Sequence, residues 1–349
     1  MEGSCRQRGA VLTRSTSRPR LPPTTPPARR ALAVPAALFV SILVLLAGGA
    51  RARAAQVTGF ASDRFEPAGA GSEWMSLESL DFGGHLRPSF ALVGDWAWKP
   101  LVFYTPSGGE IGALVRQQLV AHADAAVVLW NRARVDVGIP FALAQSGSDF
   151  LVNGQSYAAP HGGAVGDLRL GVVVRLFGRP HERVTGALGV QLFLPTGQTQ
   201  AFSGDGGVRA WTRFMVAGDR GPFAWAAQVG LHLRPQDGCG CDLAPGHELT
   251  LGASAGWRPA PRILLGPELY MSRAFSSRGA FSQAPPPVEV LLGGHVLIAP
   301  EWRASAGIAP GLTDGPGTPA VRIVVGVQYT FLPRPPVAVA APAWQSPAP

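Results

Sequence analysis

The sequence has very little lysine and little charge of either sign. Charged residues make up 15% of the 349 residues, and Lys99 is the single lysine in an otherwise all-arginine basic set. The formal net charge is +8, but seven arginines lie in residues 1–30, ahead of the expected mature chain. The basic balance is therefore weak support for a nucleic-acid partner, and no aromatic-basic recognition motif accompanies it. We expect no nucleic-acid binding.

Cysteine is also scarce. Cys5 lies in the expected leader, and Cys239 and Cys241 form a Cys-Gly-Cys sequence in an expected loop. Two neighbouring thiols without a second pair do not make a structural zinc site. They can form a small strained disulfide ring or stay reduced, and the sequence does not decide between these states. We expect no metal and no cofactor.

Long hydrophobic runs are absent except at residues 31–50. Arg29 and Arg30 precede this run, and small residues up to Ala55 follow it, which is the pattern of a secretory signal peptide. We expect residues 1–55 to be an N-terminal extension and signal peptide, cleaved near Ala54 or Ala55. Alternatives are a start codon placed too early and an uncleaved signal anchor, since the run is about long enough to span a bilayer.

The remaining chain shows a period-two pattern of apolar and polar residues. In residues 321–331 every odd position is apolar, whereas Arg322, Gly326, Gln328 and Thr330 are polar or small. This alternation is typical of a strand with one apolar and one polar face. Similar segments, twelve in all, cover residues 85–98, 112–129, 133–145, 165–177, 184–196, 207–218, 222–234, 246–257, 262–273, 287–299, 302–312 and 320–331.

Long and short connections alternate between these segments, as in outer-membrane barrels with short periplasmic turns. Tyr and Trp lie mostly near the expected strand ends, where they favour the membrane interface. We therefore predict an all-β fold, a transmembrane antiparallel up-and-down β-barrel of about twelve strands at residues 85–332. An even strand number places both termini on the periplasmic side. A secreted soluble β-sandwich is the alternative.

Two segments flank the expected barrel. Residues 56–84 have no clear period, and we expect a flexible, exposed periplasmic lead-in there. Residues 333–349 form a Pro/Ala-rich tail.

The polar face of the strands is expected to line the lumen. It can be a polar plug of paired charges or a charged pore lining with some anion bias. The predicted lumen-lining residues are Arg169, Arg175, Arg209, Arg213, Arg234, Glu248, Glu268, Glu289 and Arg322.

Four stretches resemble the N-terminal barrel region of delta-proteobacterial OmpA-family outer-membrane proteins. They are Gly189–Gly197, Gly206–Trp211, Gly256–Pro259 and Leu265–Tyr270, within a resemblance over about residues 93–332. In that family a barrel is followed by acidic repeats and a peptidoglycan-binding domain, which this sequence lacks. The cell-wall tethering that the family implies is therefore not carried over to this chain, which is either a stand-alone barrel or a truncated reading frame.

The last strand resembles the C-terminal signal that the barrel-insertion machinery recognises. Gly326, Tyr329 and Phe331 match its pattern, whereas Val324 stands where a polar residue is expected and the chain continues beyond Phe331. The resemblance implies that this machinery and outer-membrane lipid are partners of the chain.

Catalytic motifs give little support to an enzyme. Gly252–Gly256 matches the Gly-x-Ser-x-Gly elbow, but that motif needs a strand, a turn and a helix, and here the strand alternation runs straight through Ser254. The seven histidines are scattered without metal-ligand spacing. We predict no catalytic site and a structural or passive small-solute channel role in the bacterial outer membrane. The alternatives are a barrel enzyme of the acyl hydrolase type and a surface-loop binding protein or adhesin, based on loop 146–164.

Overall fold

The computed structural model describes residues 59–105, 107–152, 155–234, 246–275 and 284–332. The predicted signal peptide, the tail after residue 332 and the Cys-Gly-Cys sequence lie outside these residues. Within the part described, no helix is long and apolar enough to cross a membrane.

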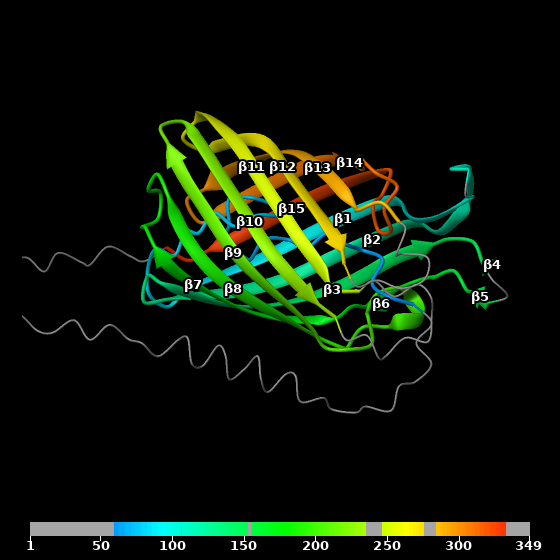
Figure 1. Cartoon of the computed structure of the whole chain (residues 1–349). Helices are drawn as coiled ribbons and strands as arrows, with labels where there is room; N and C mark the ends of the chain where they lie inside the picture. Colours follow the sequence, from blue (N-terminus) through cyan, green and yellow to red (C-terminus); the bar gives the residue numbers. More distant parts are fainter. Residues whose placement is uncertain (1–58, 106, 153–154, 235–245, 276–283, 333–349) are drawn as a thin grey trace, which may run out of the picture. The chain divides into compact units, whose positions relative to one another are not determined.

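Twelve antiparallel strands form a closed β-barrel (Figure 1). Each strand pairs with its neighbours in sequence, and β1 closes the ring by pairing with β15 over Ser89–Trp98 and Val321–Thr330. The barrel strands are β1 Arg87–Tyr104, β2 Glu110–Leu129, β3 Ala133–Ser146, β7 Leu168–Phe177, β8 Thr185–Leu194, β9 Arg209–Arg220, β10 Phe223–Leu233, β11 Glu248–Ala260, β12 Ile263–Ala274, β13 Val288–Ala299, β14 Trp302–Pro310 and β15 Val321–Thr330.

All twelve predicted strands are therefore confirmed, most of them with ends within a few residues of the prediction. The alternation of side chains explains this agreement, because successive residues of a strand point to opposite faces. In β15, Ile323 and Val325 are exposed on the outside, whereas Arg322 and Val324 are fully buried. The outer face is apolar around the barrel, as a surface in contact with lipid must be.

Smaller elements lie in the long connections. A short hairpin of β4 Phe150–Val152 and β5 Gln155–Tyr157 extends from the connection after β3, and β6 Ala164–Val165 pairs with β3. A 3₁₀ turn, η1 Thr199–Ala201, lies between β8 and β9. Phe103 packs against Phe150 and Tyr157, so this hairpin is fixed to the barrel end by aromatic contacts.

Residues 59–84, here called the plug, occupy the barrel interior. All of them are buried or half-buried, and Leu77 and Phe82 are 0% exposed. The prediction that this segment is exposed was therefore wrong. The segment has no period of its own because it forms no strand, and its side chains are matched to the barrel wall instead.

The plug runs along the barrel from one end to the other. At its start, the Ser62 amide donates to the carbonyl of Phe202 (2.9 Å), which lies in the long connection between β8 and β9. At its end, the Gly84 amide donates to Oδ1 of Asn131 (2.7 Å) in the short turn between β2 and β3. The even strand number does place the start of β1 and the end of β15 together, but the plug starts at the opposite, long-connection end.

Candidate functional site: the plugged lumen

The plug is acidic, and the inner wall is rich in arginine. Residues 59–84 contain five carboxylates and one arginine, a formal net charge of −4. Each plug carboxylate forms an ion pair with at least one wall arginine. The pairs are Asp63–Arg322, Glu66–Arg169, Glu73–Arg258, Glu73–Arg303, Glu78–Arg134 and Asp81–Arg87.

The pair of Glu78 with Arg134 is the most regular of these. Nη1 and Nη2 of Arg134 each donate to one oxygen of Glu78, both at 2.7 Å. Such a bidentate pair combines two charge-assisted hydrogen bonds in one plane. Both side chains are buried, so the pair fixes the second half of the plug against β3 without competition from water.

The wall also holds the plug backbone. Glu268 on β12 accepts hydrogen bonds from the amides of Met75 (2.8 Å), Ser76 (2.8 Å) and Leu77 (3.2 Å), and from the Ser76 hydroxyl (2.9 Å). A carboxylate with several such donors stays buried without an arginine partner. One ion pair has the charges reversed, with the arginine on the plug and the acid on the wall: Arg64 of the plug pairs with Glu248 of the wall.

Apolar contacts anchor the same segment. Trp74, Leu77, Leu80 and Phe82 form one buried cluster with inward residues of the wall. The wall residues of this cluster are Val128, Val173, Ala187, Met215, Ala217, Ala224, Ala226 and Leu264. Trp74 and Phe82 look isolated in the sequence, but each fills space that the small wall residues leave open.

Burial and ion pairing compete in setting the charge of the plug. Burial alone would raise the pKa of Glu78, but the pairing with Arg134 outweighs it, so the pKa lies below its usual value. Glu78 is therefore charged at neutral pH, and its ion pair persists there.

Two small cavities lie beside the plug. One of about 80 Å³ lies next to residues of β9 to β13, and one of about 40 Å³ lies next to β2, β3 and β7. Ordinary ligand pockets measure roughly 300–1,000 Å³. Both cavities have room for water molecules but are smaller than such a pocket.

Eight of the nine predicted lumen residues are buried inside the barrel. Arg175 is the exception: it lies near the short-turn end, where it donates to the carbonyl of Asn131. Arg213 differs from the other buried arginines of the described chain, since no carboxylate lies within ion-pair distance. It stacks on Trp211 with the guanidinium carbon 4.2 Å from the ring centre, and donates to Gln191.

The plug residues were missed by the sequence analysis, although one signal was present. The predicted lumen set contains six arginines and three glutamates. A buried excess of positive charge needs partners, and the nearest acidic, irregular stretch of the chain is residues 63–81. The excess of arginine on the inner face and the excess of carboxylates in residues 63–81 could have predicted that this stretch lies inside the barrel.

Tyr329 and Phe331 of the proposed assembly signal lie at the end of β15 on the outer side, whereas Gly326 is an inward position of the strand. Phe331 is exposed and makes edge contacts with Phe90 (6.4 Å between ring centres) and Tyr329 (4.8 Å). Tyr329 also packs against Trp302 at 4.9 Å. Gly326 faces Val93 across the β1–β15 closure. These aromatic rings form a group beside the short-turn end of the barrel.

The Gly-x-Ser-x-Gly stretch lies within β11, without the turn and helix of a nucleophile elbow. Ser254 pairs in register with Ala226 and Glu268 on the neighbouring strands. It is an inward residue of a continuous strand.

Several solved outer-membrane proteins are similar to this chain. An outer membrane channel from Pseudomonas putida F1 is similar with a TM-score of 0.57, at 12% identity over 76% of this chain and 100% of that chain. The NanC porin (TM-score 0.46, 8% identity, 70% and 100% covered) and a TodX monoaromatic hydrocarbon channel with a deletion (0.45, 10%, 76% and 99%) also match. No family model and no curated protein matches the sequence.

At this identity the first likeness shows a shared fold. The closed ring of strands, the apolar outer face and this likeness define the chain as a membrane-spanning β-barrel protein. The resemblance to OmpA-family barrels stays a prediction.

Proposed function

We propose that the protein is an outer-membrane channel for small solutes, without catalytic activity, and that its own plug restricts its passive conductance. The paired charges between plug and wall carry this proposal. These ion pairs fill the lumen together with the apolar contacts. When an ion pair separates, water can replace each lost partner. Charged groups that separate can be hydrated again, which offsets part of the cost of moving the plug, whereas an exposed apolar core has no such compensation.

The similarity to an outer membrane channel from Pseudomonas putida F1 supports a channel, and no site in the described part of the chain supports an acyl hydrolase. That chemistry needs a serine and a histidine that share one site, whereas Ser254 pairs across the sheet with Ala226 and Glu268. The adhesin alternative would use the connection with β4 and β5. Its aromatic residues pack against Phe103 of the barrel, which fixes the hairpin but supplies no evidence for a partner.

Planar-bilayer recording of the refolded mature protein tests the channel proposal. We expect small or infrequent conductance steps from the intact chain and larger, regular steps from a variant lacking residues 59–84. The open variant should prefer anions, because Arg134, Arg169 and Arg322 lose plug partners.

A second variant, Glu66→Gln with Glu78→Gln, keeps the plug but weakens its pairing and should raise the frequency of opening. Glu110→Gln is the matched control, because its partner Lys99 lies outside the lumen at the exposed strand end. Equal conductance of the intact and shortened chains would contradict the role of the plug. Silence of every variant would contradict a channel.

The aromatic group at the end of β15 is proposed to act in membrane assembly. Phe331 and Tyr329 are available on the outer surface, where an insertion machinery can bind them. We expect Phe331→Ala to reduce insertion into outer membranes in cells, while Phe90→Ala, which removes a contacting ring outside the motif, has a smaller effect. Equal insertion of both variants and the unchanged protein would reject this role.

A further inference from the structure

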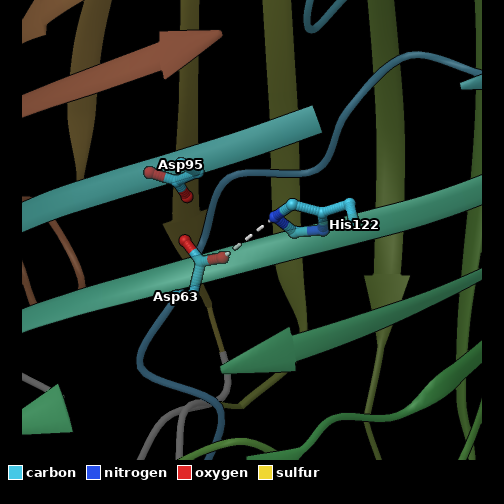
Figure 2. A group of neighbouring side chains, drawn as sticks. All are labelled: Asp63, Asp95 and His122. Carbon is cyan, nitrogen blue, oxygen red and sulfur yellow. Dashed lines mark ion pairs between the residues drawn. The ribbon is translucent and has the colours of Figure 1, made fainter. Parts of the chain in front are cut away.

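A histidine and two aspartates meet where the plug touches β1 and β2. Asp63 belongs to the plug, Asp95 to β1 and His122 to β2 (Figure 2). One side-chain atom of each lies within 4.8 Å of the others, and Nε2 of His122 is 3.5 Å from Oδ2 of Asp63. This is the single group of metal-ligating side chains found in the described part of the chain.

His122 is buried there without a hydrogen-bond partner. The side chain is 2% exposed, and neither ring nitrogen has a partner within hydrogen-bond geometry. Buried polar atoms in proteins are nearly always satisfied. Figure 2 shows the imidazole directed at the Asp63 carboxylate, and Oδ1 of Asp95 is likewise buried and without a partner. The two unsatisfied groups converge on one position.

The charges around this position do not balance. Arg322 is the common partner of Asp63, Asp95 and Glu289, so one guanidinium faces three carboxylates. A divalent cation bound beside these carboxyl groups would offset the excess of acidic over basic side chains.

Arg322 leaves suitable atoms free for such a cation. It donates to Oδ1 of Asp63 (2.8 Å) and to Oδ2 of Asp95. Oδ2 of Asp63, Oδ1 of Asp95 and Nε2 of His122 remain as lone-pair donors. Around a tetrahedral zinc ion at about 2.0–2.1 Å, ligand atoms lie about 3.3 Å apart. The 3.5 Å between Asp63 and His122 is close to this spacing.

We propose that Asp63, Asp95 and His122 form a site for a divalent transition-metal ion, with zinc as the best match, and that the ion clamps the plug to the barrel wall. One imidazole and two carboxylates suit zinc better than calcium or magnesium, which take oxygen ligands. The cavity of about 40 Å³ lined by Asp63 and His122 has room for a water as a further ligand. The site joins three segments, so bound metal stabilises the plugged state.

Calorimetric titration of the refolded mature protein with zinc chloride tests the site, whether or not the barrel conducts. Cys239 and Cys241 are replaced by serine to remove competing thiols. We expect one site that weakens by at least about tenfold in His122→Gln, since even loss of a supporting residue costs that much in metal sites. Zinc should also raise the midpoint of thermal unfolding, because it binds the folded state.

His295→Gln is the matched control. His295 is also buried, also lacks hydrogen-bond partners and lies 3.7 Å from Glu268, but it has one carboxylate beside it instead of two. It should leave zinc binding unchanged. Asp95→Asn gives a second test if His122→Gln does not fold. Equal zinc affinity in the unchanged protein and in the His122 or Asp95 variant would overturn the proposal.

Discussion

The outer and inner faces of the barrel are built from the same strands but are stabilised in different ways. On β15, Val325 points outward and is 53% exposed, while its neighbour Val324 is fully buried. Outward residues face a uniform apolar surrounding, and any apolar side chain of similar size serves there. Inward residues such as Arg322 depend on particular partners. One of those partners, Asp63, is 259 residues away in sequence.

This difference between the two faces explains why the plug contributes to the stability of the fold as well as filling the lumen. Buried arginines without partners would be costly, since taking a charge out of water costs several kcal/mol. The plug supplies most of the missing negative charge on the inner face. The plug and the inner face are thus complementary halves of one buried ionic layer, surrounded by an apolar outer face that needs no such matching.

The largest single-residue effect is expected from breaking the ionic layer at Glu78. Glu78→Gln leaves Arg134 buried without its bidentate partner. Breaking a buried pair in this way costs about 3–5 kcal/mol of unfolding free energy, which urea titration of the refolded protein in detergent would measure. Glu110→Gln serves as control, because its exposed pair with Lys99 should contribute below about 1 kcal/mol. Similar losses of unfolding free energy in Glu78→Gln and Glu110→Gln would contradict a special role of the buried ion pairs.

Acid should abolish the difference in unfolding free energy between the unchanged protein and Glu78→Gln. The pKa of Glu78 is lower in the folded state than in the unfolded state, where it is near the ordinary 4.5. Its stabilising contribution is therefore complete above that value and is lost as the pH falls through the folded pKa. The gap in unfolding free energy between the unchanged protein and Glu78→Gln should shrink in strong acid. A gap that stays constant would argue against the ion pair as its source.

The next largest effect on stability is expected on the outer face. There the cost of a substitution depends on whether the new side chain is charged or apolar. Val325→Arg places a charge near the middle of β15 on the lipid side. Such a change costs about 2–4 kcal/mol at the bilayer midplane of a barrel. Val325→Ala should cost much less. Urea titration in lipid vesicles measures both, and an equal cost in detergent without a bilayer would show that lipid is not the cause.

The outer face is also the part that the sequence predicts well. Alternation in segments such as residues 223–233 depends on local spacing alone, so the strands and their outward-facing residues can be predicted without knowing any partner. The plug cannot be found in this way, because residues 59–84 have no period and bind through pairings over long sequence distances. Glu268 was predicted to face inward, but its plug amide donors have no pattern in the sequence.

The smallest effect on stability is expected in an exposed turn at the end of the barrel, outside the inner and outer faces. His181 in the turn between β7 and β8 shares a hydrogen bond with Asp219 (2.9 Å), which raises the pKa of His181 above 6.5. The pairing stabilises the turn below that value and is lost as the pH rises through the folded pKa. Asp219→Asn should return the pKa toward 6.5 in an NMR titration. His181→Ala should change stability little because the histidine is exposed, whereas Asp219→Asn also removes the pairing of Asp219 with Arg258 (2.7 Å). An unchanged pKa would exclude the pairing.

The central claim is that residues 59–84 lie inside the barrel rather than in solvent. Ala70 is 2% exposed, and its side chain packs on Ala91 and Ala126 of the wall, so Ala70→Cys changes little else. With Cys239 and Cys241 replaced by serine, a water-soluble maleimide should label this cysteine far more slowly than a cysteine at Ser107, which is exposed. Unfolding should make the two rates equal. Equal rates in the folded barrel would contradict the account.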